Sequence, residues 1–188
     1  MRIAGLLYLG AALLMGCGAP KLDWPVYGEK LGMKVHFPGP PVDLQDSDSR
    51  EKRLVCVLIR ESAGSAWTPL TKENGSKPAT NLDNICFLEA SVEEVQDHPG
   101  NPISLQVRRS YDVDAGSPKP VKDKLGREWQ ELHWFWRDAM AKNPRSTLME
   151  RDRYMIDGNK VYRLNVKGAL GPAETNYFYD SFEIVKST

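Results

Sequence analysis

The stretch RDRYMIDGNKVYRLNVK, residues 151–167, contains two strand-like runs joined by Asp157-Gly158. In the second run, apolar side chains at positions 162, 164 and 166 alternate with polar ones at 163, 165 and 167. This is the period of a strand with one buried face. Asp-Gly between two such runs favours a tight type I′ turn, because both central residues of that turn need positive φ. We therefore expect an antiparallel hairpin of residues 151–156 and 159–167.

The segment after the hairpin predicts a short helix. Gly171-Pro172 precedes it, and proline suits the first helical turn. Thr175, Phe178 and Phe182 would form its inward stripe. Residues 183–186 are expected to add a final strand to the sheet.

The segments before the hairpin predict further strands at residues 33–37, 53–60, 85–95 and 129–137, each of which carries an alternating or β-branched apolar run. Asn101-Pro102 predicts a helix start, with Ile103, Val107 and Tyr111 on one face. Residues 61–84 and 114–126 are rich in Gly, Pro and polar side chains and predict loops. The first of these is either an Ω-type loop or a hairpin excursion.

Three short motifs connect this pattern to a known group of proteins. They are the strand ending in Phe37-Pro38-Gly39, Gly126-Arg127-Glu128 at the start of a strand, and Lys160 to Leu164 followed by Tyr179-Asp180-Ser181-Phe182. Together they resemble the PsbP-like α/β sandwich group over most of Gly28 to Val185. The resemblance implies an antiparallel sheet packed by helices. It also implies a binding or assembly role, since the group shares no catalytic set. We expect an α+β fold with an antiparallel β-sheet packed by a few helices, in a single domain of residues 28–188.

The N-terminus has the layout of a signal peptide. Arg2 supplies a positive charge, and residues 3–15 are almost unbroken in apolar and small side chains. As a helix, thirteen residues cover about 20 Å, which is less than the hydrocarbon core of a bilayer, about 30 Å thick. The run ends in Leu14-Met15-Gly16-Cys17, which resembles the bacterial lipobox.

The lipobox resemblance implies cleavage after Gly16 and a diacylglyceryl group, with acyl chains such as palmitate, on Cys17. Residues 1–16 are then a signal peptide and residues 17–27 a lipidated tether. Two acyl chains make a stable membrane attachment, whereas one does not. We expect a protein that is lipid-anchored to a bacterial membrane and faces the periplasm or the cell exterior. By the family's sorting rule, Gly18 in place of Asp permits the outer membrane. The alternative is an ordinary secretory signal in which Cys17 is incidental.

The charge balance excludes a nucleic-acid partner held by a basic field. The 188 residues have a formal net charge of zero, and loss of Arg2 leaves the remainder about one unit negative. Membrane attachment must therefore come from the lipid on Cys17. The other two cysteines, Cys56 and Cys86, are an even pair in an exported chain, so we expect a disulfide between them. The alternative is two buried thiols that pack as small hydrophobes.

No motif indicates a particular chemistry. His36, His98 and His133 lie far apart and have no metal-ligand spacing. Ser65 lacks the flanking glycines of a nucleophile elbow. We expect no metal, no cofactor and a non-catalytic binding or assembly factor of the cell envelope. The alternatives are an envelope enzyme whose site forms only in three dimensions and a purely structural envelope lipoprotein.

The aromatic segment around residues 129–136 is the candidate binding surface. Trp129, Trp134 and Trp136 would contribute a face that holds an envelope protein or an apolar ligand. The alternative reading of these tryptophans is that they fill the core.

Overall fold

The computed structural model describes residues 22–45, 50–71, 82–110, 117–137 and 147–185. The predicted signal peptide, Cys17 and the first part of the tether lie outside the described residues. The strands of the larger sheet are β3 (Val42–Gln45), β4 (Glu51–Ile59), β5 (Thr68–Pro69), β6 (Ile85–Glu94), β7 (Lys119–Lys122), β8 (Glu128–Arg137), β9 (Thr147–Asp157) and β10 (Lys160–Lys167).

A smaller sheet contains β1 (Val26–Tyr27), β2 (Met33–His36) and β11 (Glu183–Ile184). The helices are α1 (Ile103–Ser110), α2 (Pro172–Asp180) and the single 3-10 turns η1 (Glu29–Leu31) and η2 (Leu82–Asn84). Among the described residues, no helix is long and apolar enough to cross a membrane.

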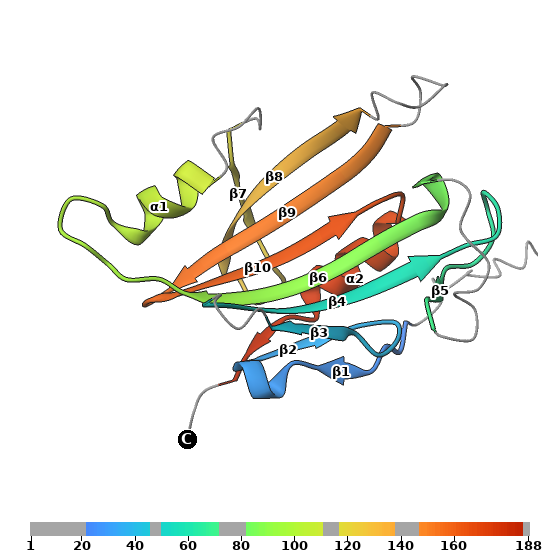
Figure 1. Cartoon of the computed structure of the whole chain (residues 1–188), viewed down its shortest axis with the longest axis horizontal. Helices are drawn as coiled ribbons and strands as arrows, with labels where there is room; N and C mark the ends of the chain where they lie inside the picture. Colours follow the sequence, from blue (N-terminus) through green and yellow to red (C-terminus); the bar gives the residue numbers. More distant parts are fainter. Residues whose placement is uncertain (1–21, 46–49, 72–81, 111–116, 138–146, 186–188) are drawn as a thin grey trace, which may run out of the picture.

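All strand pairings between the named strands are antiparallel. The larger sheet has the order β3-β4-β6-β10-β9-β8-β7, with β5 beside β4, and the smaller sheet has the order β1-β2-β11 (Figure 1). The expected antiparallel sheet is therefore present, but the described chain is richer in β-structure than an α+β sheet packed by a few helices. The expected last strand, β11, pairs with β2 and so extends the smaller sheet.

The hairpin expected over residues 151–167 forms as β9 and β10, but its turn is shifted by one residue. Lys160 pairs with Asp157, so the two turn residues are Gly158 and Asn159 instead of Asp157 and Gly158. Gly158 has φ of 60°. Glycine and asparagine both tolerate positive φ, so this pair also satisfies a tight turn. The expected alternation of β10 is confirmed, because positions 162, 164 and 166 are buried and positions 163, 165 and 167 are only half-buried.

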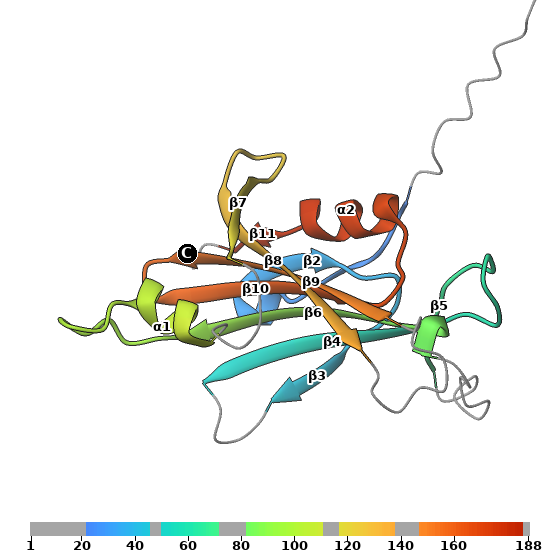
Figure 2. The ribbon, with the colours of Figure 1, turned by 90° about the horizontal axis from the view of Figure 1, so that it is seen from above.

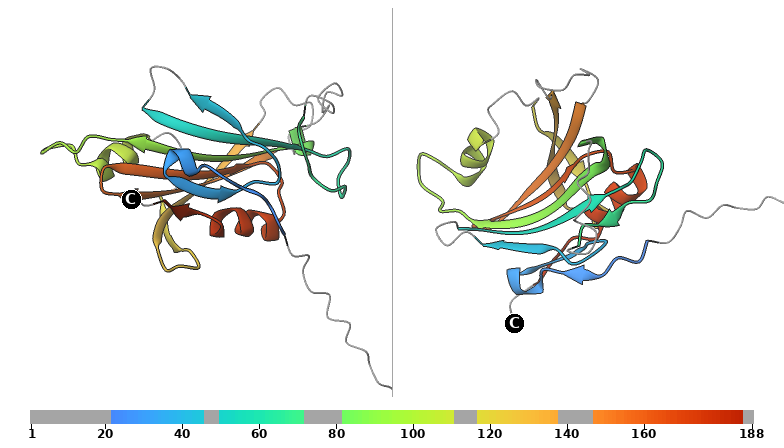
Figure 3. Two further views of the ribbon diagram at one scale, coloured as in Figure 1. Left: turned by 90° about the horizontal axis from the view of Figure 1, so that it is seen from below. Right: turned by 45° about the vertical axis from the view of Figure 1, so that its right-hand side comes forward.

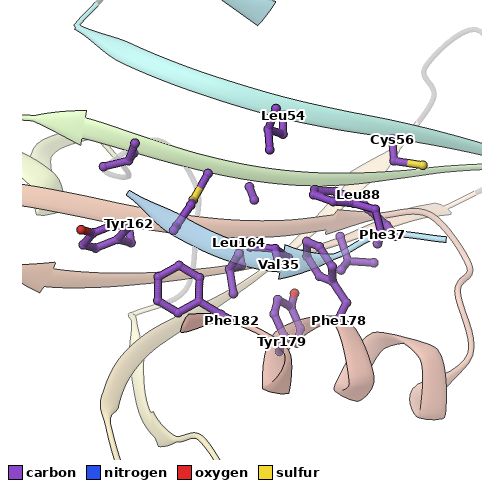
Figure 4. Close-up of a cluster of buried hydrophobic side chains, with 14 of the residues drawn as sticks. Val35, Phe37, Leu54, Cys56, Leu88, Tyr162, Leu164, Phe178, Tyr179 and Phe182 are labelled. Atoms are coloured by element: carbon purple, nitrogen blue, oxygen red, sulfur yellow. The ribbon is translucent and has the colours of Figure 1, made fainter. Parts of the chain in front are cut away.

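The main core lies between one face of the larger sheet, which we call the covered face, and a layer made of α2 and the smaller sheet (Figures 2 and 3). The predicted inward residues Thr175, Phe178 and Phe182 are all buried. Figure 4 shows Phe178, Tyr179 and Phe182 pointing toward side chains of the sheet. Both sheets thus share one core.

Four short strands lie in segments that were expected to be loops or the tether, or were not assigned. They are β1, β3, β5 and β7. β5 pairs with the end of β4, which makes part of the 61–84 segment a hairpin excursion. Its neighbour Trp67 packs under the guanidinium of Arg60, whose Cζ lies 4.5 Å from the ring centroid.

Candidate functional site

The face of the larger sheet that points away from the main core is only partly covered by described elements. At one end α1 packs on it, and Ile103 and Val107 contact a second buried cluster with Leu132, Tyr154 and Val161. Figure 3 shows α1 and the smaller sheet on opposite sides of the larger sheet. This confirms the inward face predicted for Ile103 and Val107. Tyr111, the third member of that stripe, lies outside the described residues.

Next to α1, this face carries a groove of about 350 Å³, which we call the acidic groove. Strands β4, β6, β10 and β9 lie side by side here, and strand alternation directs every second side chain of each into the groove. Val55 and Phe87 line its apolar part. Its charged lining consists of four carboxylates and two cations, namely Glu51, Glu89, Glu150, Asp152, Arg163 and Lys167.

Hydrogen bonds and ion pairs hold several of these charges in place. Asn165 donates from Nδ2 to Oε1 of Glu150 over 2.7 Å, and Lys167 Nζ lies 4.0 Å from the other oxygen of Glu150. The Ser91 hydroxyl donates to Oε1 of Glu51 over 2.9 Å. These contacts give the groove a defined charge pattern.

Glu89 lies at the centre of the groove, cross-strand from Val55 on β4 and from Asn165 on β10. Burial raises the pKa of its carboxyl above the usual value, because a charged group is costly where water is excluded. Glu51 and Glu150 add to the rise by repulsion, while Arg53 and Arg163 oppose it. Glu89 therefore keeps its proton more readily than an exposed glutamate.

Of the three tryptophans predicted to form a binding face, Trp129 lies on the covered face of the sheet. Its side chain is only 1% exposed. It packs edge-on against Phe182, with ring centroids 5.0 Å apart, and its indole nitrogen donates to Asp123. Trp129 is thus a core residue, as the alternative reading stated. The side chains of Trp134 and Trp136 lie outside what the structure describes.

The two inner cysteines are free thiols in the structure, so the predicted disulfide is not borne out. Cys56 pairs with Leu88, and Cys86 pairs with Leu58, which makes the cysteines diagonal neighbours on adjacent strands. Diagonal positions are about 7 to 8 Å apart, beyond the Cα separation of about 4.4 to 6.8 Å usual in disulfides. Both thiols pack in the core as small apolar groups, and burial raises the pKa of Cys56 to about 11 and that of Cys86 to about 12.

The three histidines remain apart in the fold. His36 Nδ1 lies 3.0 Å from the hydroxyl of Tyr177, His133 Nε2 lies 2.7 Å from a carboxylate oxygen of Glu131, and His98 lies in an exposed turn. None of them lines the acidic groove. No group of three or more His, Cys, Asp or Glu side chains among the described residues has the arrangement of a metal site.

The sequence did not predict the acidic groove because it forms only where the β9–β10 hairpin pairs with β6, and β6 with β4, strands that are distant along the chain. The alternation of Arg163, Asn165 and Lys167 on β10 was the available signal. It identified a polar face but did not say which strands lie beside it.

Comparison with known proteins gives no family for this chain. No protein-family model matches the sequence, and no curated protein matches it. Among solved structures, the chain is similar to a protein from Bacteroides thetaiotaomicron VPI-5482, with 9% identity, a TM-score of 0.46 and 82% of this chain covered. The chain spans 46% of the length of that protein.

A second similar structure is the solution structure of cyanobacterial PsbP (CyanoP) from Synechocystis sp. PCC 6803. The identity is 11% and the TM-score is 0.40, over 91% of this chain and 98% of that chain. No residue role is transferred from either protein.

Proposed function

We propose that this protein is a membrane-anchored exported lipoprotein that acts as a non-catalytic binding or assembly factor in a bacterial cell envelope. The observation that carries the proposal is the acidic groove, whose charges come from four neighbouring strands and are held by ion pairs and hydrogen bonds. A fixed pattern of charge on an accessible surface selects a partner by electrostatic complementarity.

The membrane address is supported by the lipobox-like Leu14-Met15-Gly16-Cys17. The described chain adds a constraint, because Trp24 packs edge-on against Tyr177 of α2, with ring centroids 5.3 Å apart. Trp24 also packs against the main core. From Cys17 to Trp24 the chain can span at most about 25 Å. A lipid on Cys17 would therefore hold the α2 side of the domain close to the bilayer.

The chemistry of the groove favours a protein partner over an apolar ligand. Carboxylates outnumber cations by four to two in the lining. Burying apolar surface against charged groups carries a desolvation cost that a hydrocarbon ligand does not repay. A positively charged segment of another envelope protein fits this lining, because its lysines and arginines would pair with the carboxylates.

We further propose that the domain is related to the PsbP-like group. This relationship is supported by the placement of the quoted motifs. Lys160 to Leu164 lies in β10, next to β6 and β9. Tyr179 to Phe182 covers the end of α2 and the residues just after it, and Tyr179 and Phe182 are part of the main core. A binding or assembly role is what this resemblance implies.

Site-specific photocrosslinking in intact cells tests the binding role. A photoreactive residue at Val55, which lines the groove, is compared with one at Leu125, which is 60% exposed on the β7–β8 turn. We expect an adduct of defined mass from position 55 and not from position 125.

The charge requirement is tested with the same probe at position 55. Removal of two groove carboxylates by Glu51→Gln and Glu150→Gln should reduce the adduct to less than about half. The matched control removes two carboxylates outside the groove, by Glu61→Gln and Glu128→Gln, and should leave the yield unchanged. Equal adducts from both probe positions, or equal losses in both charge variants, would contradict the proposal.

A further inference from the structure

A second groove lies on the covered face of the larger sheet, at the end where η1 packs. Its volume is about 560 Å³. Leu31 of η1 and Val92 of β6 line it and belong to the main core. The groove is therefore separate from the acidic groove, which opens on the other face.

Four cationic side chains from three separate elements converge on this groove. Lys30 comes from η1, Arg50 and Lys52 flank the first residue of β4, and Lys160 is the first residue of β10. A Cβ placed on Gly32 would lie 4.0 Å from Lys160 Nζ. The ammonium of Lys160 thus reaches from the larger sheet to the chain just after η1.

The strand register explains why the cations share one face. Lys52 lies opposite Val92, and Lys160 lies opposite Glu94. β4, β6 and β10 are neighbours in the sheet. Val92 and Glu94 are two residues apart on β6, so the side chains of Lys52 and Lys160 lie in adjacent rows on the same face, which η1 partly covers.

The charge of this groove is strongly one-sided. Among the described residues that line it, the four cations face a single carboxylate, Glu94. The ion pairs between described residues use none of these four cations. Like charges on a concave surface reinforce one another and raise the local concentration of counter-ions. We call this groove the cationic cleft.

We propose that the cationic cleft binds a phosphate-bearing anion. A phosphoryl group offers several oxygen acceptors that separate cations can share, and an arginine fork matches its geometry. The apolar floor of Leu31 and Val92 suits the carbon portion attached to the phosphate. Such a group is carried by free phosphate, by small phosphate esters or by the headgroup of an anionic lipid.

The test uses the full chain with Cys17→Ser, so that no lipid anchor contributes to binding. Calorimetry measures the binding of inorganic phosphate and glycerol phosphate. Flotation measures the binding of phosphatidylglycerol vesicles against phosphatidylcholine vesicles. We expect binding to at least one phosphate-bearing probe, weakened by added salt. Binding of the soluble probes alone assigns the cleft to small anions, and binding of phosphatidylglycerol vesicles alone assigns it to a lipid headgroup.

The decisive variant is Lys52→Gln with Lys160→Gln, which should weaken binding by about tenfold or more. The control is Lys119→Gln with Lys124→Gln, at two exposed positions around β7, which removes the same charge and should change the affinity by less than about twofold. Circular dichroism and thermal melting establish that each variant is folded. The proposal would be overturned if the Cys17→Ser chain bound none of the probes. It would also be overturned if the cleft variant and the control lost the same amount of affinity.

Discussion

Trp129 donates a hydrogen bond from its indole nitrogen to Oδ2 of Asp123 across 3.0 Å, and so connects the main core to the turn between β7 and β8. The same carboxylate oxygen accepts from Arg127 Nε over 2.6 Å. Arg127 in turn donates from its terminal nitrogen to the carbonyl of Phe182 over 2.6 Å. This chain of contacts fixes the β7–β8 hairpin to the segment after α2.

Asp123→Asn should lower the free energy of unfolding by about 1 to 3 kcal/mol, because it removes the charge that the partly buried Arg127 guanidinium pairs with. Urea denaturation measures the change. Asp97→Asn, at an exposed position, is the matched control and should change stability by less than about 0.5 kcal/mol. Equal effects of the two substitutions would show that the Asp123 contacts do not stabilise the fold.

Because of the Asp123 carboxylate, we also expect the fold to lose stability in acid. Burial alone would raise the pKa of Asp123, but hydrogen bonds from Trp129 and Arg127 outweigh it and lower the pKa below the usual value. The stabilisation is therefore present above the unfolded pKa of about 3.9 and is lost as the pH falls through the folded pKa. The difference in free energy of unfolding between the parent chain and Asp123→Asn should therefore shrink as the pH falls from about 4 through the folded pKa of Asp123.

We expect the contribution of Glu89 to stability to depend on pH in the opposite way, because burial raises the pKa of its carboxyl in the folded state. Protonated Glu89 contributes to the free energy of unfolding. This contribution is fully present below the unfolded pKa of about 4.3 and is lost as the pH rises through the folded pKa. Glu89→Gln mimics the protonated form at every pH. Its free energy of unfolding, relative to the parent chain, should therefore rise between about pH 4 and neutrality.

The control for this prediction is Glu61→Gln, at an exposed position. It should stay within about 0.5 kcal/mol of the parent chain throughout the range. A flat difference between Glu89→Gln and the parent chain would show that Glu89 is not held in a desolvated site.

The two buried cysteines should resist thiol reagents in the folded protein. The thiolate is the reactive form, and burial raises the pKa of Cys56 to about 11 and that of Cys86 to about 12. With Cys17→Ser in place, thiol titration without reductant should find two reactive thiols in denaturant and almost none in native buffer at about pH 8. No thiols in denaturant would instead show a disulfide between Cys56 and Cys86.

Local patterns were enough to predict the parts of the fold that are local in sequence. The β9–β10 hairpin depends on the alternation of Tyr162, Leu164 and Val166, and α2 begins at the predicted Gly171-Pro172. The turn was shifted by one residue, because Gly158-Asn159 satisfies the same backbone requirement as Asp157-Gly158.

The short edge strands were harder to predict. Two prolines, Pro40 and Pro41, precede β3, and Pro120 lies within β7. Proline normally argues against a strand, yet a strand at a sheet edge tolerates it because one side needs no ladder hydrogen bonds. β3 and β7 are the two edges of the larger sheet.

The candidate sites depend on contacts between distant parts of the chain. β6 and β10 are neighbours although about 70 residues separate them, and this pairing brings Glu89 beside Asn165. The cationic cleft likewise needs Lys30 of η1 and Lys160 of β10 to line one groove. No spacing along the sequence encodes either meeting, whereas the lipobox-like motif at Cys17 is contiguous and readable directly.

The claim on which the proposed function depends is the lipid anchor on Cys17. Cells that express the parent chain and the Cys17→Ser variant should be fractionated, and the protein in the membrane and soluble fractions quantified. We predict that the parent chain sediments with membranes and that Cys17→Ser is released into the soluble exported fraction, since two acyl chains account for stable attachment. Sedimentation of Cys17→Ser with membranes to the same extent as the parent chain would contradict the account.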